Sequence, residues 1–321
     1  MAERPLTPPA KPGSARRRKG LRRGSFGWML VPAVAVYLVF IAYPFVTGIR
    51  YSFFNWQGVG PLTDFIGLAN YRFIFSASGF WPFVSRVIVH SMYFFVLSFI
   101  LSVIFGLLLA FMLYNINARL SKFLQVLYFV PYVIPPIVVA YIWSMYLEPN
   151  FGLLSTLFNN MGLPFLNIPF LGEPGLALPT IVAIGTWAGL GFPVLIFLAA
   201  LMNVPGDILD AARVDGCGPW TTLVRIIFPL LQPTFMTVVT LTWIGSFSVF
   251  DIVYILEGTQ AGPNYATDVM GTLFYRTAFG GFGATAQSMS LATAVAVIGF
   301  IFVMGISAGF VWLQRRVTIE Y

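Results

Sequence analysis

Asp207–Pro233 reads DILDAARVDGCGPWTTLVRIIFPLLQP and lies between two very apolar runs of the chain. It concentrates charge that neither neighbouring run carries. Its charged side chains are Asp207, Asp210, Arg213, Asp215 and Arg225. We interpret this polar interruption as a docking element that the rest of the chain supports.

Two short helices fit this stretch. Asp207 can cap a helix over residues 208–214, because its carboxylate can accept hydrogen bonds from the exposed N–H groups. The Asp-Gly pair that ends at Gly216 predicts a turn, since glycine adopts the left-handed conformation without a Cβ clash. Pro219 suits the first turn of a second helix, and Pro229 is expected to end it. The sequence therefore predicts a helix–turn–helix element.

The composition is that of an integral membrane protein. Hydrophobic residues make up 58% of the 321 residues and charged residues only 9%, and mean hydropathy is +0.85. Soluble domains are nearer a quarter charged. The single cysteine, Cys217, excludes an intrachain disulfide and a cysteine-based metal cluster, and a single histidine, His90, excludes a multi-histidine metal site.

Six uncharged runs are long enough to cross a bilayer, which takes about 20 apolar residues. They lie within residues 26–49, 87–114, 123–147, 174–204, 226–250 and 284–314. The predicted fold class is an all-α membrane protein with six transmembrane helices. A secretory signal is the rival interpretation of the first run, but 24 apolar residues exceed the core of such a signal.

Lysines and arginines set the expected orientation. With the N-terminus inside, fourteen of them lie on the cytoplasmic side and four on the outer side, which agrees with the positive-inside tendency. Both termini are then cytoplasmic, and so is the polar segment at about 205–229 between spans four and five. Residues 1–25, basic and proline-rich, are expected to form a disordered cytoplasmic tail.

Chemistry for an enzyme acting alone is missing from the sequence. None of the three lysines follows a glycine-rich phosphate loop, so the chain does not bind ATP in that way. We predict no catalytic residue and no metal site. The six runs themselves contain no acid. Asp251 directly follows the fifth run, near the outer end of that span, and it marks either an ion or substrate path or a bond to a neighbouring helix or loop. His90 is open to a structural or a functional role.

Spans four and five are unusually polar. Small and hydroxyl-bearing residues at helical spacing can pack helices closely, and they can also bind a neutral polyol, which needs hydrogen bonds and a stacking face rather than charge. The predicted substrate path comprises Gly185, Gly189, Phe192, Thr242, Ser246 and the acid Asp251.

The polar segment resembles the EAA motif of ATP-binding cassette (ABC) importer permeases, EAA-x-x-DGA-x(5)-F-x-x-I-x-LP. The matching residues are Asp210-Ala211-Ala212, Asp215-Gly216-Cys217, Leu223, Ile226 and Phe228-Pro229. Four positions depart from the motif: Asp for Glu, Cys for Ala, Leu for Phe and Phe for Leu. Asp210 carries its carboxylate on a shorter side chain than the Glu of the motif.

Further strings are similar to the sugar-permease branch of this family. They are Phe65-Ile66-Gly67-Leu68 with Asn70-Tyr71, Pro131 to Pro135 with Trp143, Phe250-Asp251, Gly262-Pro263 and Thr267. The likeness is closer to the MalF-like member of a permease pair and covers residues 26–321, the expected permease domain.

The resemblance implies a bacterial inner-membrane subunit of a binding-protein-dependent carbohydrate importer, with a di- or oligosaccharide as substrate. Its implied partners are a second, MalG-like permease, two ATPase subunits that bind ATP and Mg, and an extracytoplasmic solute-binding protein. No cofactor is implied for this chain. The residues implied to couple to the ATPase are Asp210, Ala211, Ala212, Asp215, Gly216, Trp220 and Leu223.

The coupling helices are expected to transmit closure of the ATPase to the spans. In this interpretation Gly216 fixes the elbow, and Trp220, Leu223 and Ile227 form one apolar face. Two alternatives remain: an ion-coupled secondary transporter that uses Asp251, and a permease of the same superfamily for another solute such as glycerol phosphate.

Overall fold

The computed structural model describes residues 27–76, 79–280 and 287–317, and over these ranges it is helical, with one isolated bridge between Phe54 and Phe65 as its only extended pairing. The chain divides into two units, the first ending at Gly48 and the second beginning at Ile49. The tail predicted over residues 1–25 lies outside the described residues.

The first unit is a single apolar helix. It consists of α1 (Gly27–Tyr37), a π-helical turn η1 (Leu38–Ala42) and α2 (Tyr43–Tyr51), which runs into the second unit. Its 22 residues from Leu30 to Tyr51 are long and apolar enough to cross a membrane. This helix matches the first predicted run.

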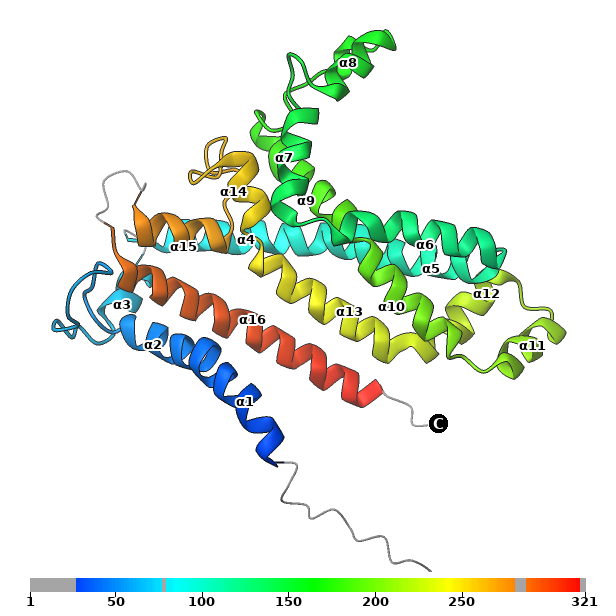
Figure 1. The fold of residues 1–321 in the computed structure, drawn as a ribbon, viewed down its shortest axis with the longest axis horizontal. Coiled ribbons are helices and arrows are strands. Elements are labelled where there is room, and N and C mark those ends of the chain that lie inside the picture. The colour runs from blue at the N-terminus through cyan, green and yellow to red at the C-terminus, as the bar shows by residue number, and fades with distance from the viewer. Residues whose placement is uncertain (1–26, 77–78, 281–286, 318–321) are drawn as a thin grey trace, which may run out of the picture. The chain divides into compact units, whose positions relative to one another are not determined.

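The second unit contains the remaining helices (Figure 1). They are α3 (Ala69–Phe75), α4 (Trp81–Ser98), η2 (Phe99–Ile104), α5 (Phe105–Asn115), α6 (Ala118–Val133), α7 (Pro136–Tyr146), α8 (Leu153–Asn160), η3 (Pro164–Leu166), α9 (Pro174–Gly189), α10 (Gly191–Met202), α11 (Gly206–Val214), α12 (Pro219–Thr222), η4 (Leu223–Ile227), α13 (Phe228–Ser248), α14 (Asp251–Glu257), α15 (Met270–Phe279) and α16 (Met289–Val317).

Long helices account for four candidate spans among the described residues, and two bent helix pairs raise the number to six if each pair crosses once. In the second unit the long helices are Trp81–Asn115, Pro219–Ser248 and Met289–Arg316. Each predicted run therefore corresponds to helix in the structure, but the third and fourth are broken.

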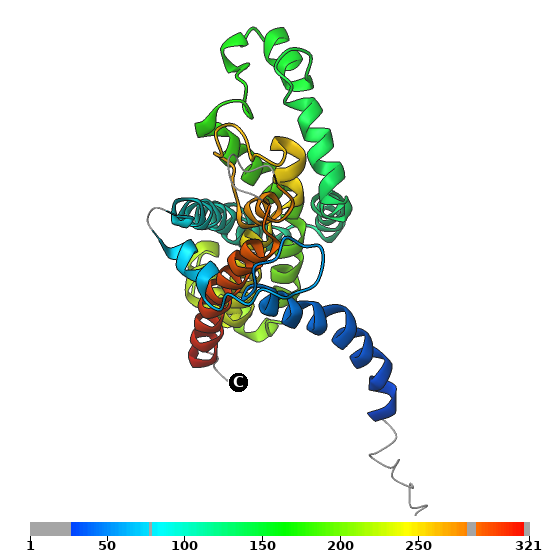
Figure 2. The ribbon, with the colours of Figure 1, turned by 90° about the vertical axis from the view of Figure 1, so that its left-hand side faces the viewer.

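The third run is broken by adjacent prolines. α6 ends at Val133 and α7 begins at Pro136, and the two helices meet at 95°. Pro135 and Pro136 lack the N–H groups needed to continue the helical ladder, and Pro135 restricts the residue before it to extended backbone. α7 thus leads away from the long helices and carries α8 at its far end (Figure 2).

The fourth run bends by 44° between α9 and α10. Pro193 cannot donate to the carbonyl of Gly189, which weakens the ladder at this point. Gly191 allows a close approach, because a Cβ there would lie 2.6 Å from the carbonyl oxygen of Tyr128 on α6. The bend and this contact bring α10 against α6.

A buried ion pair organises the segment between α14 and α15. Asp268 Oδ2 accepts a hydrogen bond from Arg276 Nη2 at 2.6 Å, and both side chains are fully buried. Thr272 donates to Asp268 Oδ1, and Arg276 Nη1 donates to the carbonyl of Thr259. His90 of α4 donates from Nδ1 to the carbonyl of Asp268 at 2.8 Å, so this hydrogen bond ties the segment to a long helix.

Asp268→Asn should lower the free energy of unfolding by about 3–5 kcal/mol, because it leaves the Arg276 guanidinium buried without a counter-charge. Thermal unfolding of the detergent-solubilised chain measures the effect. Asp210→Asn is the matched control: it removes an ion pair to Arg213 whose side chains are 73% and 70% exposed, and should change stability by less than about 1 kcal/mol. Equal melting temperatures for the two variants would contradict this account.

Candidate functional site

The polar segment (residues 205–229) turns at Gly216, as predicted. Gly216 has φ +75°, in the left-handed region. Its N–H donates to the carbonyl of Arg213, and the N–H of Cys217 donates to the carbonyl of Ala212 at 2.9 Å. This pair of bonds satisfies the last carbonyls of α11 and forms a Schellman motif, which requires the left-handed residue that glycine supplies.

Two details of the predicted helices are wrong. Asp207 does not cap α11, since the helix begins at Gly206 after Pro205, and Asp207 lies in its first turn. Pro229 does not end the second helix, which continues from Pro219 to Ser248. The π-helical turn η4 precedes the proline, and the N–H of Phe228 donates to the carbonyl of Leu223. This wider turn lets the chain pass a residue that lacks an N–H.

The residues implied to couple to an ATPase divide into an exposed and a buried set. Exposed are Asp210, Ala211, Asp215, Gly216 and Trp220. Buried are Ala212 and Leu223. The exposed set includes large apolar surface, because Trp220 is 65% exposed, and Val214, the last residue of α11, is 87% exposed. The sequence pattern did not identify Val214 as part of this apolar surface, because only its position at the end of α11 distinguishes it.

The predicted apolar face of the second helix is not continuous. Leu223 and Ile227 pack into a core with Leu209 of α11 and with α5, α10 and α13, whereas Trp220 points away from that core and is exposed. The polar segment is thus anchored by leucine and isoleucine side chains and leaves its tryptophan free for contact.

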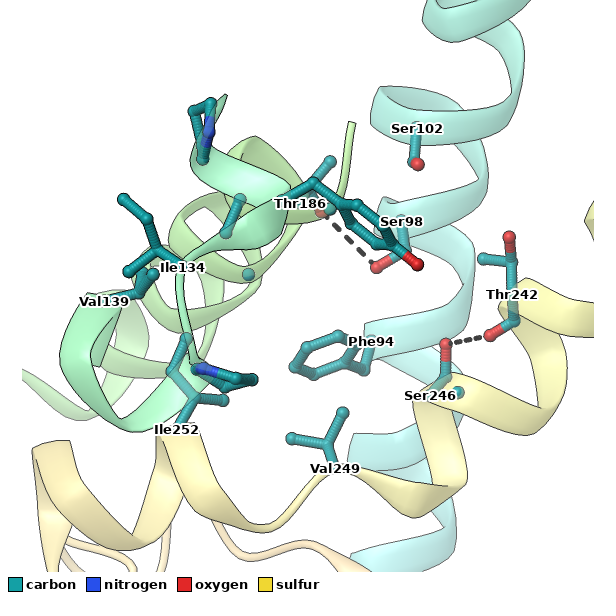
Figure 3. Close-up of a pocket in the computed structure, with 17 residues that line it drawn as sticks. Phe94, Ser98, Ser102, Ile134, Val139, Thr186, Thr242, Ser246, Val249 and Ile252 are labelled. Atoms are coloured by element: carbon teal, nitrogen blue, oxygen red, sulfur yellow. Dashed lines mark hydrogen bonds between the residues drawn. The ribbon is translucent and has the colours of Figure 1, made fainter. Parts of the chain in front are cut away.

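A cavity of about 350 Å³ lies among α4, η2, α9 and α13, beside the break between α6 and α7 (Figure 3). Its polar side chains all carry hydroxyls, and they are Ser98, Ser102, Tyr132, Thr186, Thr242 and Ser246. Ser98 and Thr186 lie 3.5 Å apart across the cavity wall. The lining residues carry no charged side chain, so the cavity suits a neutral ligand with hydroxyl groups.

Four of the predicted path residues line this cavity: Gly185, Gly189, Thr242 and Ser246. Phe192 does not. It stacks behind Tyr132, with ring centroids 5.8 Å apart and an interplanar angle of 24°, and Tyr132 lines the cavity. Asp251 also lies outside the lining, as the exposed first residue of α14.

Several lining residues were missed from the sequence. Ser98 and Ser102 stand four residues apart in the second span, and this spacing on one helix face was the available signal. Tyr132 lies next to the prolines of the α6–α7 break, and Phe94 lies one turn before Ser98. The direction of the break decides which aromatic ring faces the cavity, and the sequence pattern does not encode that direction.

Glu257, at the end of α14, precedes a loop with three non-glycine residues at positive φ: Ala261, Asn264 and Tyr265. Burial raises the pKa of the Glu257 carboxyl from its ordinary 4.5 to about 7, since the charged form loses solvation. Left-handed backbone at residues such as Ala261 and Tyr265 is costly and persists only where surrounding contacts enforce it. The Glu257 carboxyl, with its raised pKa, therefore lies at the start of this constrained loop.

Glu257 should make a contribution to the free energy of unfolding of the wild type that falls as pH rises from about 4.5 to about 7. The folded chain binds the Glu257 proton more tightly than the unfolded chain, so this contribution is complete below pH 4.5 and lost above pH 7. Melting temperatures across this range for wild type and Glu257→Gln measure it as a difference. Glu173→Gln, at an exposed carboxylate, is the control. A pH slope that is the same in all three proteins would refute the assignment.

Gly189→Leu should abolish solute passage while the chain still inserts and assembles. A Cβ at Gly189 meets no atom within 4 Å, so the added side chain would occupy the cavity rather than strain the helix. Gly309→Leu is the matched control, because its Cβ position is equally open and it does not line the cavity. Uptake by membrane vesicles measures both variants. Normal uptake by Gly189→Leu would show that solute does not pass this cavity.

Comparison with known proteins identifies relatives over most of the chain. Residues 102–318 match the family model described as "Binding-protein-dependent transport system inner membrane component". The chain is 31% identical to the trehalose/maltose transport system permease protein MalF of Thermococcus litoralis, over 88% of this chain and 93% of that protein. It is 29% identical to the diacetylchitobiose uptake system permease protein NgcF of Streptomyces coelicolor, over 99% and 90% respectively.

The fold is also similar to that of solved structures. A chain of a bacterial ABC transporter involved in the import of the acidic polysaccharide alginate superposes with a TM-score of 0.75 at 23% identity, covering 92% of this chain and 96% of that chain. At this level of identity the likeness concerns the fold.

Proposed function

Because the chain belongs to the family of inner membrane components of binding-protein-dependent transport systems, we propose that it forms half of the translocation pathway of an ATP-driven importer for a neutral di- or oligosaccharide. The observation that carries the proposal is the cavity lined by hydroxyl groups and two aromatic rings, with no charged side chain. Sugars are held by such groups, through hydrogen bonds and ring contacts.

Relatives named for sugar transport support this substrate class. They include the trehalose/maltose and diacetylchitobiose permeases and the multiple sugar-binding transport system permease MsmF of Streptococcus mutans. A relative from Pectobacterium atrosepticum is named for sn-glycerol-3-phosphate, at 26% identity. A phosphate ester favours cationic partners, and the cavity lining has none. The neutral lining therefore favours a sugar.

The proposed orientation places both termini and the polar segment in the cytoplasm of a bacterial cell, with the chain as a multi-pass inner-membrane protein. Fourteen lysines and arginines against four support this arrangement. An ion-coupled carrier that uses Asp251 is the weaker alternative, because Asp251 lies outside the cavity lining.

The polar segment is the proposed contact for a separate ATPase that binds ATP and Mg, and this chain supplies no ATPase activity of its own. In this segment exposed Trp220 and Val214 supply apolar surface, and exposed Asp215 and the Asp210–Arg213 ion pair supply charge. The full assembly would contain a second, MalG-like permease, two ATPase subunits and an extracytoplasmic solute-binding protein. The EAA-like motif and the family support these partners.

Gly216→Val should uncouple the reconstituted complex, reducing sugar-stimulated ATP hydrolysis by at least about tenfold. A β-branched residue is strained at φ +75°, so the elbow would shift. Gly216→Asn is the matched variant, because asparagine tolerates the left-handed conformation, and it should retain most of the activity. ATP hydrolysis with and without loaded binding protein measures both. Full stimulation in an assembled Gly216→Val complex would refute the coupling role.

A further inference from the structure

Three aromatic rings form a connected cluster on α7 and α9 that the hydroxyl-lined cavity does not include. Trp143 contacts Trp187 edge to face, with centroids 5.6 Å apart and an interplanar angle of 77°. Trp143 also contacts Tyr146 at 6.1 Å and 71°. Trp187 is 46% exposed and Tyr146 is 40% exposed, whereas Trp143 is half-buried between them. The two outer rings therefore present open aromatic surface.

The cluster is continuous with the cavity along α7. Pro136 and Val139 line the cavity, and Trp143 and Tyr146 follow at spacings of four and three residues. Residues at these spacings share one face of a helix. The face of α7 that borders the cavity thus continues, one and two turns further on, as aromatic rings.

α9 supplies the third ring from a helix that also borders the cavity. Thr186 and Ala188, on both sides of Trp187 in the chain, are lining residues. Edge-to-face contact with Trp143 fixes the plane of the Trp187 ring, and such contacts hold aromatic rings in defined orientations. A fixed and partly exposed indole at the margin of a neutral cavity is suited to stacking.

We propose that Trp187, oriented by Trp143 and flanked by Tyr146, is a stacking subsite for a pyranose ring outside the hydroxyl-lined cavity. The proposal rests on the proposed function. The C–H face of a pyranose packs on an aromatic plane, while its hydroxyls point to the rim. Three aromatic residues without an ionic group favour a neutral ring over an anion. α7 leads into residues 148–173, which the proposed orientation places outside, so Trp143 and Tyr146 lie nearer that side along α7 than the lining residues Pro136 and Val139.

Trp187→Leu and Trp187→Phe in the assembled transporter test the subsite. Leucine keeps apolar bulk without a ring face, and phenylalanine keeps a face. Uptake of labelled maltose, trehalose and diacetylchitobiose is measured in proteoliposomes with saturating binding protein, alongside ATP hydrolysis. For whichever sugar wild type imports, sugar moved per ATP should fall about tenfold with leucine and less than about threefold with phenylalanine.

Trp312→Leu is the control for loss of an exposed tryptophan. Its ring is 55% exposed near the end of α16, under Arg316, and outside the cluster, so uptake should not change. If Trp187→Leu does not assemble, the same comparison is made with Tyr146→Leu and Tyr146→Phe. Sugar moved per ATP should again fall more with leucine than with phenylalanine. Equal uptake by the leucine and phenylalanine variants would overturn the subsite and leave the rings as packing or interfacial anchors. Absence of uptake of all three sugars by wild type would overturn the proposed function, and the subsite with it.

Discussion

This structure depends on where prolines remove backbone N–H donors from its helices. Pro135 and Pro136 end one helix and begin another at 95°, and Pro193 coincides with the bend of the fourth run. In a membrane, irregular backbone is tolerated where protein covers it or where it lines a cavity. Here the α6–α7 break lines a cavity, together with Gly185 and Gly189 of the fourth run. Hydroxyl groups and glycine backbone thus line one cavity, which straight apolar helices would have filled.

One helix connects that space to the polar segment. The chain from Pro219 to Ser248 is helical throughout, so Leu223 and Ile227, packed beside α11, belong to the same rod as the cavity-lining Ser246. Trp243 anchors the rod to α16 through a hydrogen bond from its indole N–H to the carbonyl of Val303 at 3.1 Å. A rigid helix packed at both ends can carry a displacement over its length. We infer that movement of the polar segment reaches the cavity by this route.

The sequence predicted what local chemistry determines. Hydropathy located the six apolar runs, which correspond to helices in the described residues, and the Asp-Gly pair located the left-handed Gly216. It did not locate the shorter helices α3, α8, α14 and α15. Small and hydroxyl residues in spans four and five identified four of the cavity-lining positions. The remainder depends on three-dimensional packing. The helix passes Pro229 by a π-helical turn, and Tyr132 rather than Phe192 lines the cavity. Both features follow from contacts between helices, which a single sequence does not encode.

The central claim is that this chain passes a neutral sugar with energy from a separate ATPase. Reconstitution into liposomes, with the chain either alone or with its partner permease, ATPase and loaded binding protein, tests it most directly. The account predicts uptake of a neutral di- or oligosaccharide only by the complete complex and only with ATP inside the compartment that the polar segment faces. Uptake by the chain alone, driven by a proton or sodium gradient without ATP, would contradict it.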